Sequence, residues 1–169
     1  RGRSAVIVGV RISALMMIAT LAAALVLTLV PVPPAIASAR PAFYTITVLF
    51  WVMNQPDRFG LLAAWLAGLM IDVIYGTPLA EHGLAMAVAA YGMIKIREWL
   101  WGLPLIQQTI FVAPVLLIYE FVLFWIDGVA GLDVNPWYRW LPVVSSTLLW
   151  PAWAYLLERI ARAETRHTG

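Results

Sequence analysis

Few side chains in this sequence could carry chemistry, and most of them interrupt or border runs of apolar residues. Asp72 lies in one such run, Glu81 and His82 follow after a short turn, and Glu120 lies in a later run. A carboxylic acid held beside a base can transfer protons, and such a pair can also bind a ligand or a partner. We therefore take Asp72, Glu81, His82 and Glu120 as candidates for one polar cluster.

The sequence lacks the other parts of familiar active sites. Two histidines, one of them in the tail, are too few for a metal cluster, and there is no cysteine for a thiolate site. There is also no Gly-x-Ser-x-Gly elbow, no Walker loop and no second membrane aspartate to pair with Asp72. We expect a protein that is not an enzyme and that needs no metal or cofactor.

The composition is that of a membrane protein. Of 169 residues, 63% are hydrophobic and 12% are charged, whereas a soluble domain carries roughly a quarter charged residues. Nine Trp and six Tyr are many for this length, and several lie beside the apolar runs, as in the aromatic belts of membrane interfaces. The net charge of +2 is scattered along the chain, which argues against nucleic acid as a partner.

Six apolar runs separated by short polar turns predict an all-α integral membrane protein with six short transmembrane helices. The first run could instead be the core of a signal peptide, but it is longer than such cores and a second apolar segment follows at once. We therefore expect one polytopic membrane domain over residues 1–169. Its helices are predicted at about residues 10–30, 41–53, 59–75, 79–96, 104–126 and 140–158.

The distribution of Lys and Arg orients the predicted helices, because basic residues accumulate on the cytoplasmic side. With the N-terminus inside, only Arg40 and Arg139 fall outside. Both termini are then cytoplasmic in a bacterial inner membrane, and the four candidate cluster residues lie towards the outer side. The basic residues predicted to be cytoplasmic are Arg1, Arg3, Arg11, Arg58, Lys95, Arg97, Arg159, Arg162 and Arg166.

The third apolar run carries small residues at every fourth position, with one carboxylate among them. This stripe consists of Gly60, Ala64, Gly68, Asp72 and Gly76. It predicts a close packing seam with the fourth helix, which is rich in Gly and Ala. Asp72 must face protein, because a charged carboxylate inside a membrane costs about 2.5–3.5 kcal/mol. It could brace the turn that follows or form a partner or ligand site, whereas His82 and Glu120 are first interpreted as structural.

Residues 51–84 carry a specific set of motifs. A Trp precedes a Pro-Asp-Arg-x-Gly turn, and Ala-Trp-x-x-Gly-Leu-x-x-Asp and Gly-x-Pro-Leu-x-x-His follow. This pattern resembles the rod shape-determining protein MreD family. Ala80 and Gly83 depart from the family pattern, which has Gly and Ala at these positions, so that in each case one small residue replaces another. The motif residues we single out are Pro56, Asp57, Arg58, Trp65 and Pro78.

The resemblance implies a non-enzymatic scaffold of the bacterial elongation (rod) complex. Such a protein would bind and stabilise the bitopic MreC through its transmembrane helix, beside RodA, its transpeptidase and MreB, and so support peptidoglycan synthesis and rod cell shape. The family is also thought to share its helical fold with substrate-binding subunits of energy-coupling-factor transporters. The alternative function is therefore a membrane subunit that binds a small, vitamin-like molecule in an enclosed cavity of several hundred Å³ lined by Asp72 and His82.

Overall fold

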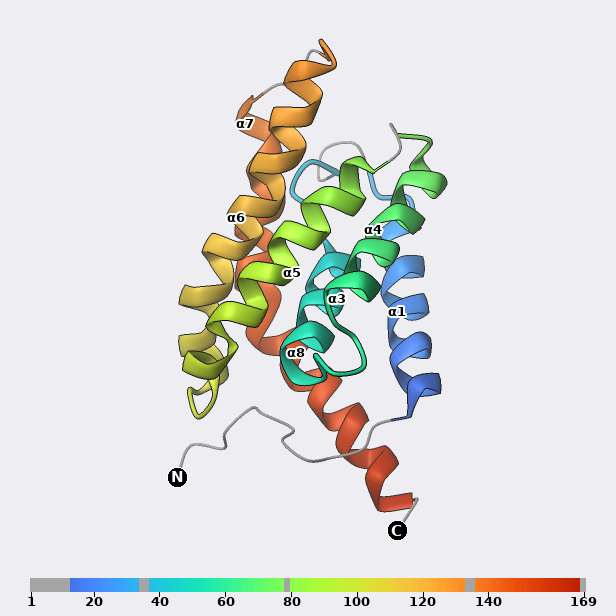
Figure 1. The fold of residues 1–169 in the computed structure, drawn as a ribbon, viewed down its shortest axis with the longest axis vertical. Helices are drawn as coiled ribbons and strands as arrows, with labels where there is room; N and C mark the ends of the chain where they lie inside the picture. Colours follow the sequence, from blue (N-terminus) through green and yellow to red (C-terminus); the bar gives the residue numbers. More distant parts are fainter. Residues whose placement is uncertain (1–12, 34–36, 78–79, 133–135, 168–169) are drawn as a thin grey trace.

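The computed structural model describes residues 13–33, 37–77, 80–132 and 136–167, and the regular elements in these ranges are all helices (Figure 1). Six long helices correspond to the six predicted apolar runs, and one short helix lies between the last two. The prediction of an all-α fold is confirmed for the described part of the chain. The elements are α1 (Ala14–Leu29), α3 (Phe43–Asn54), α4 (Leu61–Tyr75), α5 (Glu81–Leu100), α6 (Leu105–Val129), α7 (Pro136–Arg139) and α8 (Leu141–His167).

Several helix boundaries differ from those predicted, because polar residues do not end the helices. α5 continues to Leu100 where an end at 96 was predicted, and α8 continues to His167 where an end at 158 was predicted. The added residues include Ala, Glu and Arg, which favour helix even outside an apolar run. The predicted starts at residues 10 and 79 lie outside the described residues.

α6 differs from its prediction in a way that matters for the polar cluster. It continues past 126 to Val129, so Asp127 and Gly128 are helical and not part of a loop. The chain leaves the helix at Gly131, which has a left-handed φ of 71°. Glycine adopts this conformation without steric cost, which is why it commonly follows a helix end. The short helix α7, which the sequence did not predict, begins with a proline at a position where no N–H partner is needed.

α3 is the central helix of the bundle. Its residues from Tyr44 to Met53 are all buried, and it packs against α1, α4, α5 and α8. A helix that is apolar on every side suits this position, because no face of it meets water. Two indole N–H groups tie neighbours to it: Trp51 donates to Thr20 of α1, and Trp153 of α8 donates to Thr47, each at 2.9 Å.

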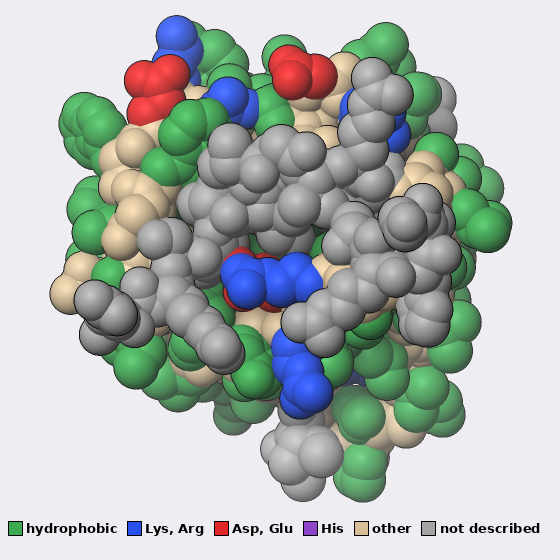
Figure 2. All heavy atoms as spheres, turned by 90° about the horizontal axis from the view of Figure 1, so that it is seen from below, with side chains coloured by type: hydrophobic (Ala, Val, Ile, Leu, Met, Phe, Trp, Pro, Cys, Tyr) green, Lys and Arg blue, Asp and Glu red, His purple; other side chains and the backbone are tan. Residues whose placement is uncertain are grey.

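The long helices alternate in direction, so α1 begins and α8 ends at the same lower end of the bundle (Figure 1). The turn that contains Arg58 and the end of α5 also lie there. Seen from below, this face carries several Lys and Arg side chains, with a few acidic side chains among them (Figure 2). α7, which contains Arg139, lies at the opposite end. This arrangement is the one that the predicted orientation requires.

Helix length separates α6 from the other apolar helices. Among the described helices, α6 alone is both long enough and apolar enough to cross a membrane by length and composition, while α1, α3 and α4 are apolar but shorter. α3 has 12 residues and so extends over about 18 Å, against about 30 Å for a bilayer core. The number of helices over the apolar runs therefore agrees with the prediction, whereas among the described helices α6 alone passes both the length and the composition test for a membrane span.

Candidate functional site

The helical hairpin of α4 and α5 brings two backbones into direct contact. A Cβ atom placed on Gly68 of α4 would lie 2.4 Å from the carbonyl oxygen of His82 and 2.7 Å from Cα of Gly83. A Cβ atom placed on Gly83 would lie 2.8 Å from the side chain of Leu69. The neighbours of Gly68 are backbone atoms that cannot move aside, so this position is too close for any side chain, and glycine permits the approach. The neighbour of Gly83 is the end of a leucine side chain, which can shift.

The structure divides the predicted small-residue stripe into a buried middle and two ends. Ala64, Gly68 and Asp72 are buried within the bundle. Gly60 instead precedes α4, where a Cβ atom would lie 2.9 Å from a carbonyl oxygen of the preceding turn. Gly76 follows α4 with a left-handed φ of 65° and has no atom within 4 Å of its Cβ position. The two end glycines thus shape turns and do not form the seam.

Replacing Gly68 with alanine is expected to destabilise the protein by about 3 kcal/mol, because the added methyl group meets backbone atoms that cannot move aside. The measurement is unfolding of the purified protein in mixed micelles with increasing dodecyl sulfate. Gly92→Ala in α5 is the matched control, since a Cβ atom there would lie 3.9 Å from Val115. The control should gain up to about 1 kcal/mol of helix propensity. Equal stability of the two variants would contradict the close seam.

Asp72 caps the first turn of α5 from the neighbouring helix. Its side chain is 0% exposed. Oδ1 accepts hydrogen bonds from the N–H of His82 at 2.8 Å and the hydroxyl of Thr77 at 3.0 Å, and Oδ2 accepts from the N–H of Gly83 at 3.1 Å. Nδ1 of His82 also lies 2.9 Å from Oδ1. The carboxylate therefore satisfies N–H groups that have no partner within a helix.

A second group of charged side chains surrounds Arg139, the last residue of α7. Its Nη1 lies 2.5 Å from Oδ2 of Asp127, and its Nε lies 3.3 Å from Oε2 of Glu120. The three side chains are 19%, 8% and 11% exposed, respectively. Glu81, at the start of α5, is also buried and lies near the side chain of Asp127. One guanidinium thus compensates two carboxylates of α6 and fixes α7 to the bundle.

The four candidate residues all lie at the upper end of the bundle, but in two adjacent groups. Asp72 and His82 pair with each other, while Glu120 and Glu81 belong to the group around Arg139. Together the two groups connect α4, α5, α6 and α7. The carboxylate of Asp72 is engaged with the start of α5, and those of Glu120 and Asp127 form ion pairs with Arg139, so these side chains act as ties between helices. Among the described residues, no three His, Asp or Glu side chains are grouped to hold a metal ion.

Sequence reasoning missed three participants in these groups. Thr77 lies in the turn that follows the helix of Asp72. A hydroxyl residue about one turn after a buried carboxylate could have been used to predict that the two side chains bond to each other and cap the next helix. Asp127 was assigned to a loop because α6 was predicted to end before it. Arg139 was noted only as one of two basic residues on the outer side, and a rare cation near buried carboxylates is itself a signal for an ion pair.

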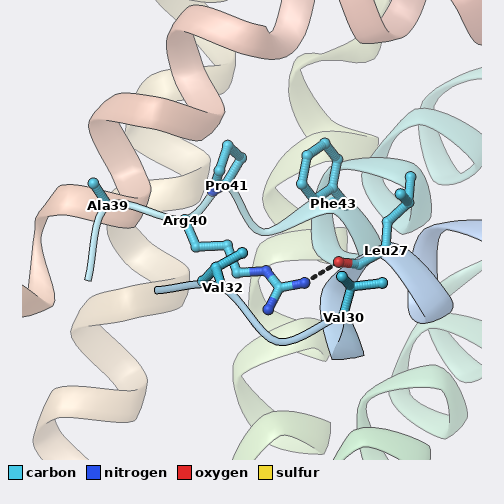
Figure 3. A pocket seen from close by; sticks show the side chains of 7 residues that line it. All are labelled: Leu27, Val30, Val32, Ala39, Arg40, Pro41 and Phe43. Carbon is cyan, nitrogen blue, oxygen red and sulfur yellow. Dashed lines mark hydrogen bonds between the residues drawn. The ribbon is translucent and has the colours of Figure 1, made fainter. Parts of the chain in front are cut away.

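Two cavities lie near this end of the bundle. One has a volume of about 290 Å³ and includes His82, Glu120 and Tyr75 in its lining, but not Asp72. The transporter alternative required Asp72 in the wall, so its prediction is not met. The other cavity, of about 340 Å³, is mainly apolar and is crossed by Arg40, whose guanidinium donates to the carbonyl oxygen of Leu27 (Figure 3).

The described motif residues lie in the turn before α4 and in the first half of that helix. Asp57 and Arg58 are exposed in the turn between α3 and α4, which is closed by hydrogen bonds from the N–H groups of Arg58 and Phe59 to the carbonyl oxygen of Gln55. The indole nitrogen of Trp65 would lie 3.4 Å from a Cβ atom on Gly83, so this tryptophan packs beside the seam. Pro56 belongs to the same turn as Asp57, whereas Pro78 lies outside the described residues.

Comparison with known proteins agrees with these motifs. The family described as "rod shape-determining protein MreD" matches residues 10–160 of this chain. A curated relative, "Rod shape-determining protein MreD" of Haemophilus influenzae, is 29% identical over 143 residues, which cover 85% of this chain and 88% of the relative. No solved structure matches the chain significantly. The family match spans most of the chain and includes both groups of polar residues, so this chain belongs to the MreD family of rod shape-determining proteins.

Proposed function

We propose that this chain is a multi-pass scaffold of the bacterial inner membrane that binds and stabilises MreC within the elongation complex and thereby supports peptidoglycan synthesis and rod cell shape. The observation that carries the proposal is the family match over residues 10–160. RodA, its transpeptidase and MreB would then be further members of the same assembly.

The arrangement of the buried charged groups supports a scaffold and not an enzyme. Asp72 is fully enclosed between α4 and α5, and Glu120 and Asp127 are paired with Arg139. A catalytic carboxylate must reach a substrate with a free acid or base group. Asp72 is enclosed, and Glu120, although it lines the cavity of about 290 Å³, is paired with Arg139. The outer surfaces of the helices carry large apolar side chains, which suit contact with lipid and with a partner helix.

The position of the basic residues supports a multi-pass topology. The helices alternate in direction, and the described Lys and Arg side chains other than Arg40 and Arg139 lie towards the end where α1 begins and α8 ends (Figures 1 and 2). By the positive-inside rule, we infer that this end faces the cytoplasm. The tied outer ends of α4 to α7 would face the periplasm.

Depletion of this protein in its rod-shaped host is expected to round the cells and to lower the recovery of MreC from membranes. The same host complemented with the wild-type gene is the control, and cell width and MreC level are the measurements. Unchanged cell shape together with unchanged MreC recovery would overturn the proposal.

A photocrosslinking scan would test whether the partner's transmembrane helix binds the bundle directly. Suitable positions on four helices are more than 70% exposed: Leu15, Val73, Ile110 and Leu148. Because a docked helix covers one face, MreC should crosslink strongly at one or two adjacent positions and weakly at the others. Replacing the MreC transmembrane helix with a polyleucine helix should remove this preference. Equal crosslinking at all four positions would contradict a specific site.

A further inference from the structure

A large groove lies at the lower, basic end of the bundle, away from the polar groups described above. It has a volume of about 800 Å³ and lies between the start of α6 and the second half of α8. Pro151 lies inside α8, where a proline removes a backbone hydrogen bond and bends a helix. Beyond it α8 runs away from the start of α6 and towards α1, where the N–H of Ser13 donates to Glu164 (Figure 1). The groove is lined by Pro104, Leu105, Ile106, Pro151, Ala152, Tyr155, Glu158, Arg159, Arg162 and Ala163.

The groove contains an acidic group that lacks a full set of partners. Glu158 is 6% exposed, and its Oε2 accepts from Nη2 of Arg162 at 3.3 Å. Its Oε1 is buried and has no hydrogen-bond partner among the described residues. A buried carboxylate oxygen without a donor is costly, and such atoms usually receive a hydrogen bond from a ligand or another group. This oxygen therefore points to a donor that enters the groove.

The same groove also presents a positive charge and an apolar wall. Arg159 is exposed and stacks on the ring of Tyr155 at 5.9 Å, and no carboxylate pairs with it among the described residues. Arg162 lies three positions further on, one helical turn away, so the two guanidinium groups can approach one anion. Ile106 and Tyr155 are 76% and 50% exposed and extend the wall with apolar surface.

We propose that this groove binds a phosphatidylethanolamine molecule of the inner leaflet. Arg159 and Arg162 bind the phosphate, Oε1 of Glu158 accepts an N–H from the ammonium group, and Ile106 and Tyr155 contact an acyl chain. The groove places two guanidinium groups beside one buried carboxylate oxygen, and this arrangement of charges favours a head group that has both a phosphate and an ammonium group. A phosphate ligand that carries no N–H donor would leave Oε1 of Glu158 without a hydrogen bond. A basic peptide would be repelled by Arg159. The inference rests on the membrane location proposed above.

A head-group series on the wild-type protein tests the role of Glu158 without any mutation. Phosphatidylethanolamine and its mono-, di- and trimethylated forms carry the same charge, but each methyl group removes one N–H donor. Retention of these lipids on the detergent-purified protein is measured by native mass spectrometry. We expect retention to fall by about tenfold from the unmethylated to the trimethylated lipid, as one charge-assisted hydrogen bond would give. Equal retention across the series would overturn the assignment.

Two variants locate the site. Glu158→Gln should abolish the preference for the unmethylated lipid, and Arg159→Gln should weaken retention of every lipid in the series. Arg97→Gln is the matched control, because Arg97 also stacks on an aromatic ring, that of Trp101, near the end of α5. If Arg159→Gln retains lipid as well as Arg97→Gln does, the groove is not the site. Phosphatidylglycerol gives the second arm: retention above that of phosphatidylethanolamine would show that the anion alone decides binding and would overturn the proposal.

Failure of this inference can be told apart from failure of the proposed function. A protein that retains no lipid selectively but still crosslinks to MreC would disprove the groove site alone. A protein that does not fractionate with membranes would disprove the multi-pass scaffold, and with it the basis for a lipid site.

Discussion

Replacing Asp72 with alanine is expected to lower the free energy of unfolding by about 3 to 5 kcal/mol, since buried N–H donors left without an acceptor each cost about 1–3 kcal/mol. The change removes the acceptor for the backbone N–H groups of His82 and Gly83, which lie 2.8 and 3.1 Å from the carboxylate. It also removes the hydrogen bond of Thr77 and the contact with the histidine ring. α4 and α5 should then separate at the end where their backbones touch.

Unfolding in mixed micelles, followed by the intrinsic fluorescence of the nine Trp residues, measures this effect. Asp72→Asn should show an intermediate loss, because the amide keeps one acceptor oxygen and places an NH₂ group against donors. Asp57→Ala is the control: it removes the same charge from an exposed turn and should change stability by less than about 0.5 kcal/mol. If Asp72→Ala unfolds like the wild type but no longer recovers MreC, the carboxylate binds a partner and does not cap α5.

Features that depend on neighbours in the sequence could be predicted. Apolar runs and the Lys and Arg pattern predicted six helices that alternate in direction, and the structure has six helices over these runs. The spacing around Gly68 predicted a close approach of two helices, and the structure places this contact between α4 and α5. Asp72 and His82 are ten residues apart across one turn, so a helical hairpin brings them together. Each of these signals is local and needs no knowledge of the tertiary fold.

The central position of α3 could not be predicted, for a physical reason. In a lipid environment a residue that faces acyl chains and a residue that faces protein are both apolar, so hydrophobicity does not report burial. The run from 41 to 53 appeared only as a short apolar segment, although Ile46, Phe50 and Trp51 are fully buried. Burial of this helix follows from the surrounding helices and not from its own pattern.

The group around Arg139 was missed because a helix end was misplaced. With α6 ending near 126, Asp127 belonged to a loop and had no defined direction. With α6 continuing to Val129, Glu120 and Asp127 are seven positions apart and lie on the same face of one helix. Arg139 then reaches both through the short helix α7, which carried no apolar pattern. The pairing is therefore clear only when the true helix length is known.

Replacing Arg139 with glutamine is expected to destabilise the protein by about 3 to 5 kcal/mol, because removal of one partner leaves buried charges without compensation. Glu120 and Asp127 are 11% and 8% exposed, and Arg139 is their common partner. α7 should detach from α6, and the amides at this outer end of the bundle should then lose protection from hydrogen exchange. Unfolding in mixed micelles gives the energy, and hydrogen exchange of the amides near α7 gives the location.

The variant that also carries Glu120→Gln and Asp127→Asn separates a loss of charge balance from a loss of packing. All three side chains are then neutral and close to their original size, so most of the lost stability should return. Lys95→Gln is the control for the loss of one exposed cation, and it should leave stability within about 0.5 kcal/mol of the wild type. If the triple variant is as unstable as Arg139→Gln, the hydrogen bonds of the guanidinium hold α7 in place. If Arg139→Gln alone is as stable as Lys95→Gln, the outer end of the bundle is held by the Asp72 cap and the helix seam, and α7 contributes nothing to it.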